Sequence, residues 1–184
     1  MRMTDFIYKP RTGEEVQRAT GGLPIRLYSD MCKAMHYEDP VGVLMKACFP
    51  FNKCIILLQN PKRMNSGHWT GLEFNPAKKE AYFFSSYGGK PDEEKNRWID
   101  ISGRLKSEQE TNPINNALKQ LCARGWTIFY NDYPYQVEGD NTATCGIWTA
   151  AFLNSGLNPD DFAEYNQVHE RDVFYYYKKY FLNE

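Results

Sequence analysis

Two residues far apart in the chain, His68 and Cys145, have the side chains needed for nucleophilic chemistry, and Gln136 lies between them. A thiol attacks an acyl carbon efficiently only as the thiolate, so a nucleophilic cysteine needs a nearby base and a favourable electric field. Histidine is the side chain best suited to accept a thiol proton near neutral pH. The question is therefore which elements would bring His68 and Cys145 together.

The sequence around Cys145 predicts the start of a helix. The polar residues 140–142 are typical of a turn, and Gly146 to Leu153 has the length and apolar spacing of a buried helix. At a helix N-terminus the unpaired backbone N–H groups carry partial positive charge, which stabilises a thiolate. Gly146 has no side chain and would let a substrate backbone approach the cysteine.

Strands are predicted around His68. Residues 53–59 form an apolar run suited to a buried strand, and residues 68–74 and 81–85 have the character of two further strands. The residues between these two favour a hairpin connection. The remaining predictions are a strand at 126–130 and helices at 28–49 (broken near 39–40), 91–104, 113–124, from 159, and at 173–181, the last with an aromatic stripe that packs in the core.

Length and composition indicate a single domain over residues 1–184. The 42% of hydrophobic and 15% of aromatic residues are ample material for one core. Residues 1–24 contain Lys9-Pro10-Arg11-Thr12-Gly13 and Thr20-Gly21-Gly22, which predict an irregular N-terminal arm that wraps the domain and has no chemistry of its own. No run is apolar enough to span a membrane, and the first residues do not resemble a signal peptide.

Charge and cysteine content exclude other classes of protein. The 22 basic and 23 acidic residues give a formal charge of −1, so no overall positive field makes nucleic acid an obligatory partner, although a local patch is compatible with it. The five cysteines form no CxxC pair and their number is odd, which favours a reducing compartment over a zinc site or a disulfide framework. Cys48 and Cys54 lie in apolar runs and are expected to be buried, inert thiols. No metal or other cofactor is expected.

The chain resembles the adenovirus-type maturation protease (adenain) family and, more distantly, the proteases that process SUMO and other ubiquitin-like proteins. About half of the chain is covered, and the order of histidine, glutamine and cysteine differs from that of papain, where the cysteine comes first. The matching positions are His68-Trp69, Asn75-Pro76, Lys79, Tyr82, Phe84, Gly88, Gln136, Asp140, Ala143, Cys145-Gly146 and Phe152-Leu153.

The resemblance implies an α+β fold of the papain-like or adenain-like cysteine peptidase type, with a central, mostly antiparallel sheet flanked by helices. It implies that Cys145 is the nucleophile and His68 the general base. It also implies that Gln136 and the Cys145 backbone N–H stabilise the oxyanion, an interaction worth roughly 3 to 4 kcal/mol in comparable sites. Trp69 is expected to pack beside the catalytic pair and contact substrate.

The third position of the catalytic triad departs from the family. Seventeen residues after His68, where relatives place Glu, Asp or Asn, this chain has Ser85. A serine hydroxyl can accept a hydrogen bond from the imidazole but adds no negative charge, so a weaker base or a Cys–His dyad is expected. Asn75 and Ser86 are alternative partners for the histidine.

The function that the resemblance implies is cleavage of viral capsid or core precursor proteins at Gly-containing sites during virion maturation, in a small DNA virus or virophage. Such an enzyme would act in the virion and in the host cytoplasm or viral factory. A peptide activator is compatible with the sequence, but one disulfide-bonded to Cys122 is not supported. Two alternatives stay open: an isopeptidase or processing protease for a ubiquitin-like modifier, and a catalytically silent virion structural protein, for which Ser85 is the main support.

Overall fold

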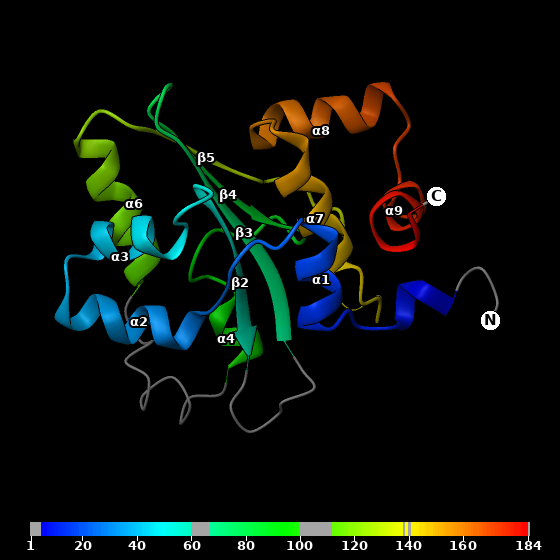
Figure 1. Ribbon diagram of the computed structural model, residues 1–184, viewed down its shortest axis with the longest axis horizontal. Coiled ribbons are helices and arrows are strands. Elements are labelled where there is room, and N and C mark those ends of the chain that lie inside the picture. Colours follow the sequence, from blue (N-terminus) through cyan, green and yellow to red (C-terminus); the bar gives the residue numbers. More distant parts are fainter. Residues whose placement is uncertain (1–4, 60–66, 100–111, 138, 140, 184) are drawn as a thin grey trace.

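The structure is a computed structural model that describes residues 5–59, 67–99, 112–137, 139 and 141–183. A five-stranded sheet with strand order β1-β2-β3-β4-β5 runs through the middle of the molecule, with helices on both sides (Figure 1). The strands are β1 (Ile25–Leu27), β2 (Lys53–Gln59), β3 (Gly67–Asn75), β4 (Glu80–Ser85) and β5 (Thr127–Tyr130). The α+β class, the 75–79 hairpin and the strands expected from the sequence are confirmed.

The sheet is mixed, which corrects the expectation of a mostly antiparallel one. The central pairs β2–β3 and β3–β4 are antiparallel, whereas β1 runs parallel to β2 and β5 runs parallel to β4. Parallel neighbours require crossover connections, and here helical segments lie between β1 and β2 and between β4 and β5. Only the hairpin between β3 and β4 could be recognised from its short connection.

The helices form a layer on each side of the sheet. One core cluster lies under α2, α3 and α6, and the other lies under α1, α7, α8 and α9 (Figure 1). The helices are α1 (Gly13–Ala19), α2 (Tyr28–Tyr37), α3 (Pro40–Ala47), α4 (Lys95–Trp98), α6 (Pro113–Ala123), α7 (Cys145–Ser155), α8 (Pro159–Val168) and α9 (Val173–Tyr177), with a 3-10 turn η1 (Asp5–Tyr8) and a π turn η2 (Lys178–Leu182). None of the described helices is long and apolar enough to cross a membrane.

Strand β3 and helix α7 bring the two reactive residues together. Every residue of β3 from 68 to 74 is buried, because helices cover both faces of the sheet. Gly71 faces α7, and a Cβ there would lie 3.2 Å from the Leu153 side chain. The absence of a side chain at Gly71 therefore lets α7 pack directly on β3.

The described part of the N-terminal segment, residues 5–24, is more regular than expected. Residues 13–19 form α1, which begins with a capping box: Glu15 N–H donates to Thr12 Oγ1 (3.2 Å), and Thr12 N–H donates to Glu15 Oε2 (2.8 Å). Val16 is fully buried in the cluster that contains α7. The helix was missed because it has only seven residues, and a helix so short depends on its cap and on tertiary packing.

Two helix predictions need adjustment. Of the helix expected at 91–104, the described part contains only the short α4, and residues 100–104 lie outside the described residues. The terminal segment is α-helical to Tyr177 and then turns into η2. Its aromatic side chains pack against the core as predicted, with Phe6 stacked on Tyr177 at 4.5 Å between ring centroids.

Candidate active site

His68 lies at the beginning of β3 with its side chain fully buried. Its ring is enclosed by two aromatic rings, with Trp98 stacked at 5.4 Å and an interplanar angle of 13°, and Tyr87 tilted at 4.9 Å. Trp98 ends α4, and Tyr87 follows β4. The imidazole is thus held in one orientation and is shielded from bulk water.

A carboxylate lies against this histidine. His68 Nε2 is 3.1 Å from Glu94 Oε2 and 3.0 Å from Ser85 Oγ, and the Ser85 hydroxyl lies 2.8 Å from both carboxylate oxygens of Glu94. Ser85 therefore contacts the imidazole, at the position to which the resemblance assigned the third catalytic residue. The negative charge comes from Glu94, which the sequence reasoning missed.

A glycine turn after β4 lets Glu94 reach the histidine. Gly88 has a φ of 78°, in the region that favours glycine, and a Cβ at Gly89 would lie 2.8 Å from the Glu94 side chain. This Gly-Gly pair, followed by acidic residues, is the sequence signal that could have indicated a chain reversal toward the sheet. The family spacing directed attention to Ser85 instead.

The segment that carries Glu94 is anchored by Asp92. The Asp92 carboxylate accepts hydrogen bonds from the Tyr28 hydroxyl, from Asn115 N–H (2.7 Å) and from Ile114 N–H (3.4 Å), so it joins α2 and the first turn of α6. Asp92 is almost fully buried and has a φ of 71°. Because these contacts fix residue 92, they restrict the position of the carboxylate two residues later.

The contacts at Nε2 determine which nitrogen can act as the base. With Ser85 and the Glu94 carboxylate as acceptors, Nε2 carries a proton, and the neutral ring then has its lone pair on Nδ1. Nδ1 is buried and has no nitrogen or oxygen partner among the described residues. It is therefore the nitrogen that remains for the thiol of Cys145.

Cys145 is the first residue of α7, as predicted, and the residue as a whole is half-buried. Burial alone would raise the pKa of this thiol. The hydrogen bond and charge of His68, together with the backbone N–H groups of Trp69 and Gly146, outweigh burial and lower the pKa of Cys145 below its ordinary value. The sequence prediction of a helix start at this residue is confirmed.

The pKa of His68 changes in the opposite direction. Its complete burial lowers the pKa, but hydrogen bonds and charges from Cys145 and Glu94 raise it from the ordinary 6.5 to about 9. A lowered cysteine pKa and a raised histidine pKa both favour the thiolate–imidazolium pair at neutral pH. Both shifts thus act to increase the fraction of Cys145 present as thiolate.

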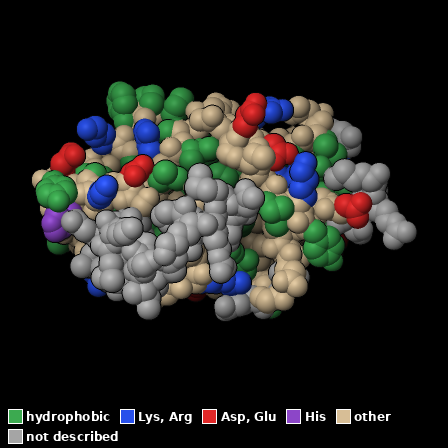
Figure 2. All heavy atoms as spheres, turned by 90° about the horizontal axis from the view of Figure 1, so that it is seen from below, with side chains coloured by type: hydrophobic (Ala, Val, Ile, Leu, Met, Phe, Trp, Pro, Cys, Tyr) green, Lys and Arg blue, Asp and Glu red, His purple; other side chains and the backbone are tan. Residues whose placement is uncertain are grey.

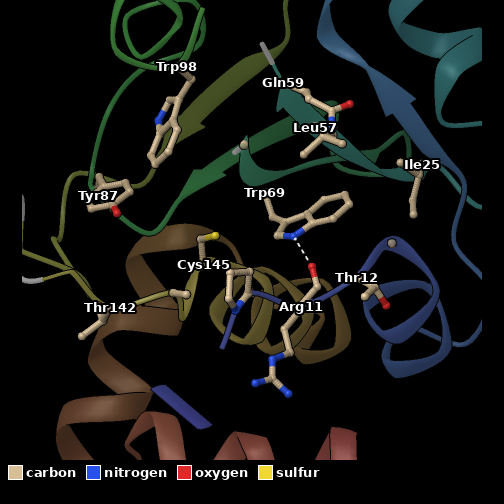
Figure 3. A pocket seen from close by; sticks show the side chains of 14 residues that line it. Arg11, Thr12, Ile25, Leu57, Gln59, Trp69, Tyr87, Trp98, Thr142 and Cys145 are labelled. Atoms are coloured by element: carbon tan, nitrogen blue, oxygen red, sulfur yellow. Dashed lines mark hydrogen bonds between the residues drawn. The ribbon is translucent and has the colours of Figure 1, made fainter. Parts of the chain in front are cut away.

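Cys145 opens into a pocket with a volume of about 650 Å³ (Figure 3). The Trp69 indole forms one wall beside the thiol, and Tyr87 and Trp98 lie on the other side. Beyond Trp69 the pocket continues to Ile25 and Leu57. The full lining is Pro10, Arg11, Thr12, Gly13, Ile25, Leu57, Gln59, Gly67, Trp69, Tyr87, Trp98, Thr142, Ala143 and Cys145.

The N-terminal segment, to which the sequence analysis assigned no chemistry, forms part of this pocket. The Trp69 indole N–H donates to the Arg11 carbonyl (3.1 Å), and this bond fixes the tryptophan against the segment (Figure 3). The Arg11 guanidinium is itself tied to the carbonyls of Phe6 (3.0 Å) and Lys9 (2.8 Å). Residues 10–13 thus act as a fixed wall beside Trp69.

Gln136 is buried next to the site but is engaged with the protein. Its Oε1 accepts from the Ser86 hydroxyl (2.5 Å), and its amide nitrogen lies 3.3 Å from Thr142 Oγ1 and 3.4 Å from the Thr142 carbonyl. Thr142 lines the pocket, whereas Gln136 is not among the lining residues. An oxyanion-hole donor must point at the substrate oxygen, so the catalytic role of Gln136 stays a prediction.

The other predicted residues have structural contacts. Gly146 is buried, and a Cβ there would lie 3.0 Å from Arg11 Cβ and 3.1 Å from Trp69 Cδ1, so its missing side chain accommodates these neighbours rather than an open approach path. The Asn75 side chain accepts a hydrogen bond from Lys78 N–H in the hairpin, and Ser86 binds Gln136. The partners of His68 at Nε2 are thus Ser85 and Glu94, not Asn75 or Ser86.

No family model matches the chain. It is similar to uncharacterized protein V9 of Sputnik virophage, with 29% identity over 154 residues that cover 84% of this chain and 78% of the virophage protein. The name of that relative assigns it no activity. Conclusions about chemistry therefore rest on the geometry of the site.

The geometry combines the parts that nucleophilic acyl chemistry requires. Cys145 has a thiol of lowered pKa at a helix start, and Glu94 places a carboxylate at one ring nitrogen of His68. The other ring nitrogen has no nitrogen or oxygen partner within the part of the chain that the structure describes. The adjoining pocket is large enough for several residues of an extended peptide. The arrangement is suited to attack on an acyl carbon and transfer of a proton to the leaving group.

Proposed function

We propose that the protein is a cysteine endopeptidase of the papain-like or adenain-like fold, with Cys145 as nucleophile and His68 as general base. The observation that carries this proposal is the cluster of buried His68 and Ser85 with partly buried Glu94, beside a half-buried Cys145 at the start of α7. A structural ion pair would also shift pKa values, but it would not need a thiol at the mouth of a pocket.

In the proposed mechanism the Cys145 thiolate attacks the carbonyl carbon of the scissile peptide bond, and a tetrahedral intermediate forms. The negative oxygen is stabilised by the Cys145 backbone N–H and, after its amide turns from Thr142, by Gln136. Protonated Nδ1 of His68 donates its proton to the leaving amine, and the C–N bond breaks to give a thioester. Nδ1 then accepts a proton from a water molecule that hydrolyses the thioester, and the thiol is released.

Glu94 and Ser85 act on this cycle through His68. The carboxylate stabilises the imidazolium that is present whenever Nδ1 carries the proton, and the two acceptors at Nε2 maintain the ring orientation. Glu94 thus takes the role of the Glu, Asp or Asn that relatives have at the position of Ser85. This contact argues against the catalytically silent alternative, for which Ser85 was the main support.

The proposed substrates are viral capsid or core precursor proteins cleaved at Gly-containing sites. The aromatic rings of Trp69, Tyr87 and Trp98 around the thiol favour a small residue at the scissile bond. Similarity to a virophage protein supports a viral origin. The proposed places of action are the virion and the host cytoplasm or viral factory. A peptide activator is compatible with this proposal.

The net charge of the protein gives no reason to expect DNA as a required partner. The formal net charge is −1, and basic and acidic side chains are interspersed on the face seen in Figure 2. Strong non-specific binding to nucleic acid depends on clustered positive charge. We expect activity on peptides to be nearly independent of added DNA.

The test is a comparison of fluorogenic peptides that differ only at the two residues preceding the cut, Gly-Gly against Leu-Leu, with Cys145→Ala as the inactive control. The proposal predicts cleavage of the Gly-containing peptide and none by Cys145→Ala. Equal cleavage of both peptides would refute the specificity. Failure to cleave either peptide, together with slow alkylation of Cys145, would refute the proposal that the protein is a cysteine endopeptidase. Release of an intact ubiquitin-like protein in preference to peptides would favour the isopeptidase alternative.

A further inference from the structure

Cys48 and Cys54, the two thiols expected to be inert, lie directly against each other. Their Sγ atoms are 3.1 Å apart, and both side chains are fully buried. Cys48 is the C-cap residue of α3, and Cys54 lies in β2. A disulfide has an S–S bond of about 2.05 Å, so a shift of roughly 1 Å would bring these sulfurs to bonding distance.

The turn between the two cysteines keeps them together. The Asn52 carbonyl accepts a hydrogen bond from Phe74 N–H (2.7 Å), which attaches the turn to the end of β3. The Phe49 and Phe51 side chains on the same turn are 73% and 51% exposed. The sulfurs therefore belong to the core cluster under α3 and adjoin a short surface turn.

We propose that Cys48 and Cys54 form a modification site, a thiol pair that a peroxide converts into an intramolecular disulfide. One thiolate attacks a peroxide oxygen, the O–O bond breaks, and a sulfenic acid and hydroxide form. The second thiolate attacks the sulfenic sulfur, the S–S bond forms, and hydroxide leaves. Overall, two thiols lose two electrons and two protons, and one hydrogen peroxide becomes two water molecules.

Oxidation of this pair is slower than oxidation of Cys145. Burial, followed by the hydrogen bond and charge of Cys54, raises the pKa of Cys48 well above its ordinary value, so the closed turn contains little thiolate. Burial also excludes the oxidant until the turn opens. Cys145 is half-buried and its pKa is lowered, so it reacts first unless it is removed.

The disulfide would join α3 to β2 without changing the proposed active site. Cys54 pairs with Leu72 in the sheet, whereas His68 pairs with Leu58 near the other end of the same two strands. A cross-link that closes a loop stabilises the folded state chiefly by restricting the unfolded chain. We therefore expect the oxidised protein to unfold at a higher urea concentration. This inference does not depend on the proposed function.

Peptide mapping tests the site directly. Folded Cys145→Ala protein is treated with hydrogen peroxide, alkylated with N-ethylmaleimide in denaturant and digested with trypsin. Lys53 lies between the two cysteines, so peptides 47–53 and 54–62 separate unless a disulfide joins them. The expected product is the linked pair, lighter than the two free peptides by two hydrogen atoms, about 2 Da, and separated again by dithiothreitol.

Two variants serve as controls. Cys54→Ser removes the linked pair, whereas Cys122→Ser, at the exposed thiol of α6, leaves it unchanged. Separate, fully alkylated peptides after treatment that oxidises Cys122 would overturn the proposal. Linkage that appears only when peroxide is added to denatured protein would overturn it as well. If Cys54→Ser does not fold, the mapping of Cys145→Ala alone decides the outcome.

Discussion

Replacing Glu94 by glutamine removes the charge beside His68 while leaving its size and its hydrogen bond with Ser85. The rise in the pKa of His68 from 6.5 to about 9 corresponds to roughly 3 kcal/mol of net stabilisation of the imidazolium. Cys145 and Glu94 produce this rise against the effect of burial. If Glu94 supplies about half of it, its charge stabilises the ion pair by roughly 1 to 2 kcal/mol, a factor of about ten.

The assay for Glu94→Gln is the rate of alkylation of Cys145 by iodoacetamide as a function of pH. Less stable imidazolium means a smaller fraction of thiolate, so the rate at pH 6 to 7 should fall by up to about tenfold. Cleavage should fall mainly in kcat, because Glu94 does not line the pocket. The lower-pH limb of the profile should move toward the behaviour of a free thiol, which titrates near about 8.5.

Glu93→Gln is the matched control, since it makes the same change in charge one residue away at an exposed position. Its profile should match that of the unmodified protein. An alkylation profile of Glu94→Gln that coincides with that of Glu93→Gln would refute the argument that Glu94 stabilises the imidazolium. Equal losses in both variants would indicate only a general effect of net charge.

Three further predictions concern the site and its support. Ser85→Ala should slow alkylation less than Glu94→Gln, because the direct contact of 3.1 Å between His68 and Glu94 remains; a larger loss would contradict this ranking. Gly146→Ala should lower the free energy of unfolding by about 1 to 3 kcal/mol in urea titrations. Adding Val16→Ala, which removes a contact of 3.0 Å with the new Cβ, should recover part of this loss. If the double variant instead loses the sum of the two single-variant losses, this packing argument is contradicted. The pKa of His68 is raised in the folded protein, so its protonation stabilises the fold fully below about pH 6.5, and this contribution is lost as pH rises through about 9. The difference in unfolding free energy between the unmodified protein and His68→Gln should therefore shrink from pH 7 to 10.

The parts of the fold that could be predicted are those whose sequence pattern is set by burial on the sheet. The apolar run of β2, the hairpin between β3 and β4 and the apolar stretch of α7 each carry their own signal. Helix α1 does not, because its seven residues depend on the Thr12–Glu15 cap and on packing of Val16 against α7. The parallel pairing of β1 with β2 and of β5 with β4 depends on crossover connections, which no local sequence pattern reveals.

The candidate site could be predicted only where a residue's surroundings are set by the neighbouring sequence. Cys145 could be located because a helix start is visible in the sequence around it. Glu94 could not, because it reaches His68 through a glycine turn and through the anchoring of Asp92 by residues of α2 and α6. Spacing along the chain therefore identified Ser85, which hydrogen-bonds to both His68 and Glu94, and missed the Glu94 carboxylate.

The imidazole requires a negative charge at Nε2, and we expect that a carboxylate at position 85 can replace the one at position 94. The double variant Ser85→Asp with Glu94→Ser tests this directly, because it moves the carboxylate to the family position and leaves a hydroxyl at the other. We expect it to alkylate Cys145 faster than Glu94→Gln at pH 6 to 7. Ser85→Asp alone places two carboxylates within hydrogen-bond distance, so one must bind a proton, and it should unfold more easily. A double variant no faster than Glu94→Gln would mean that the position of Glu94, and not its charge alone, orients His68.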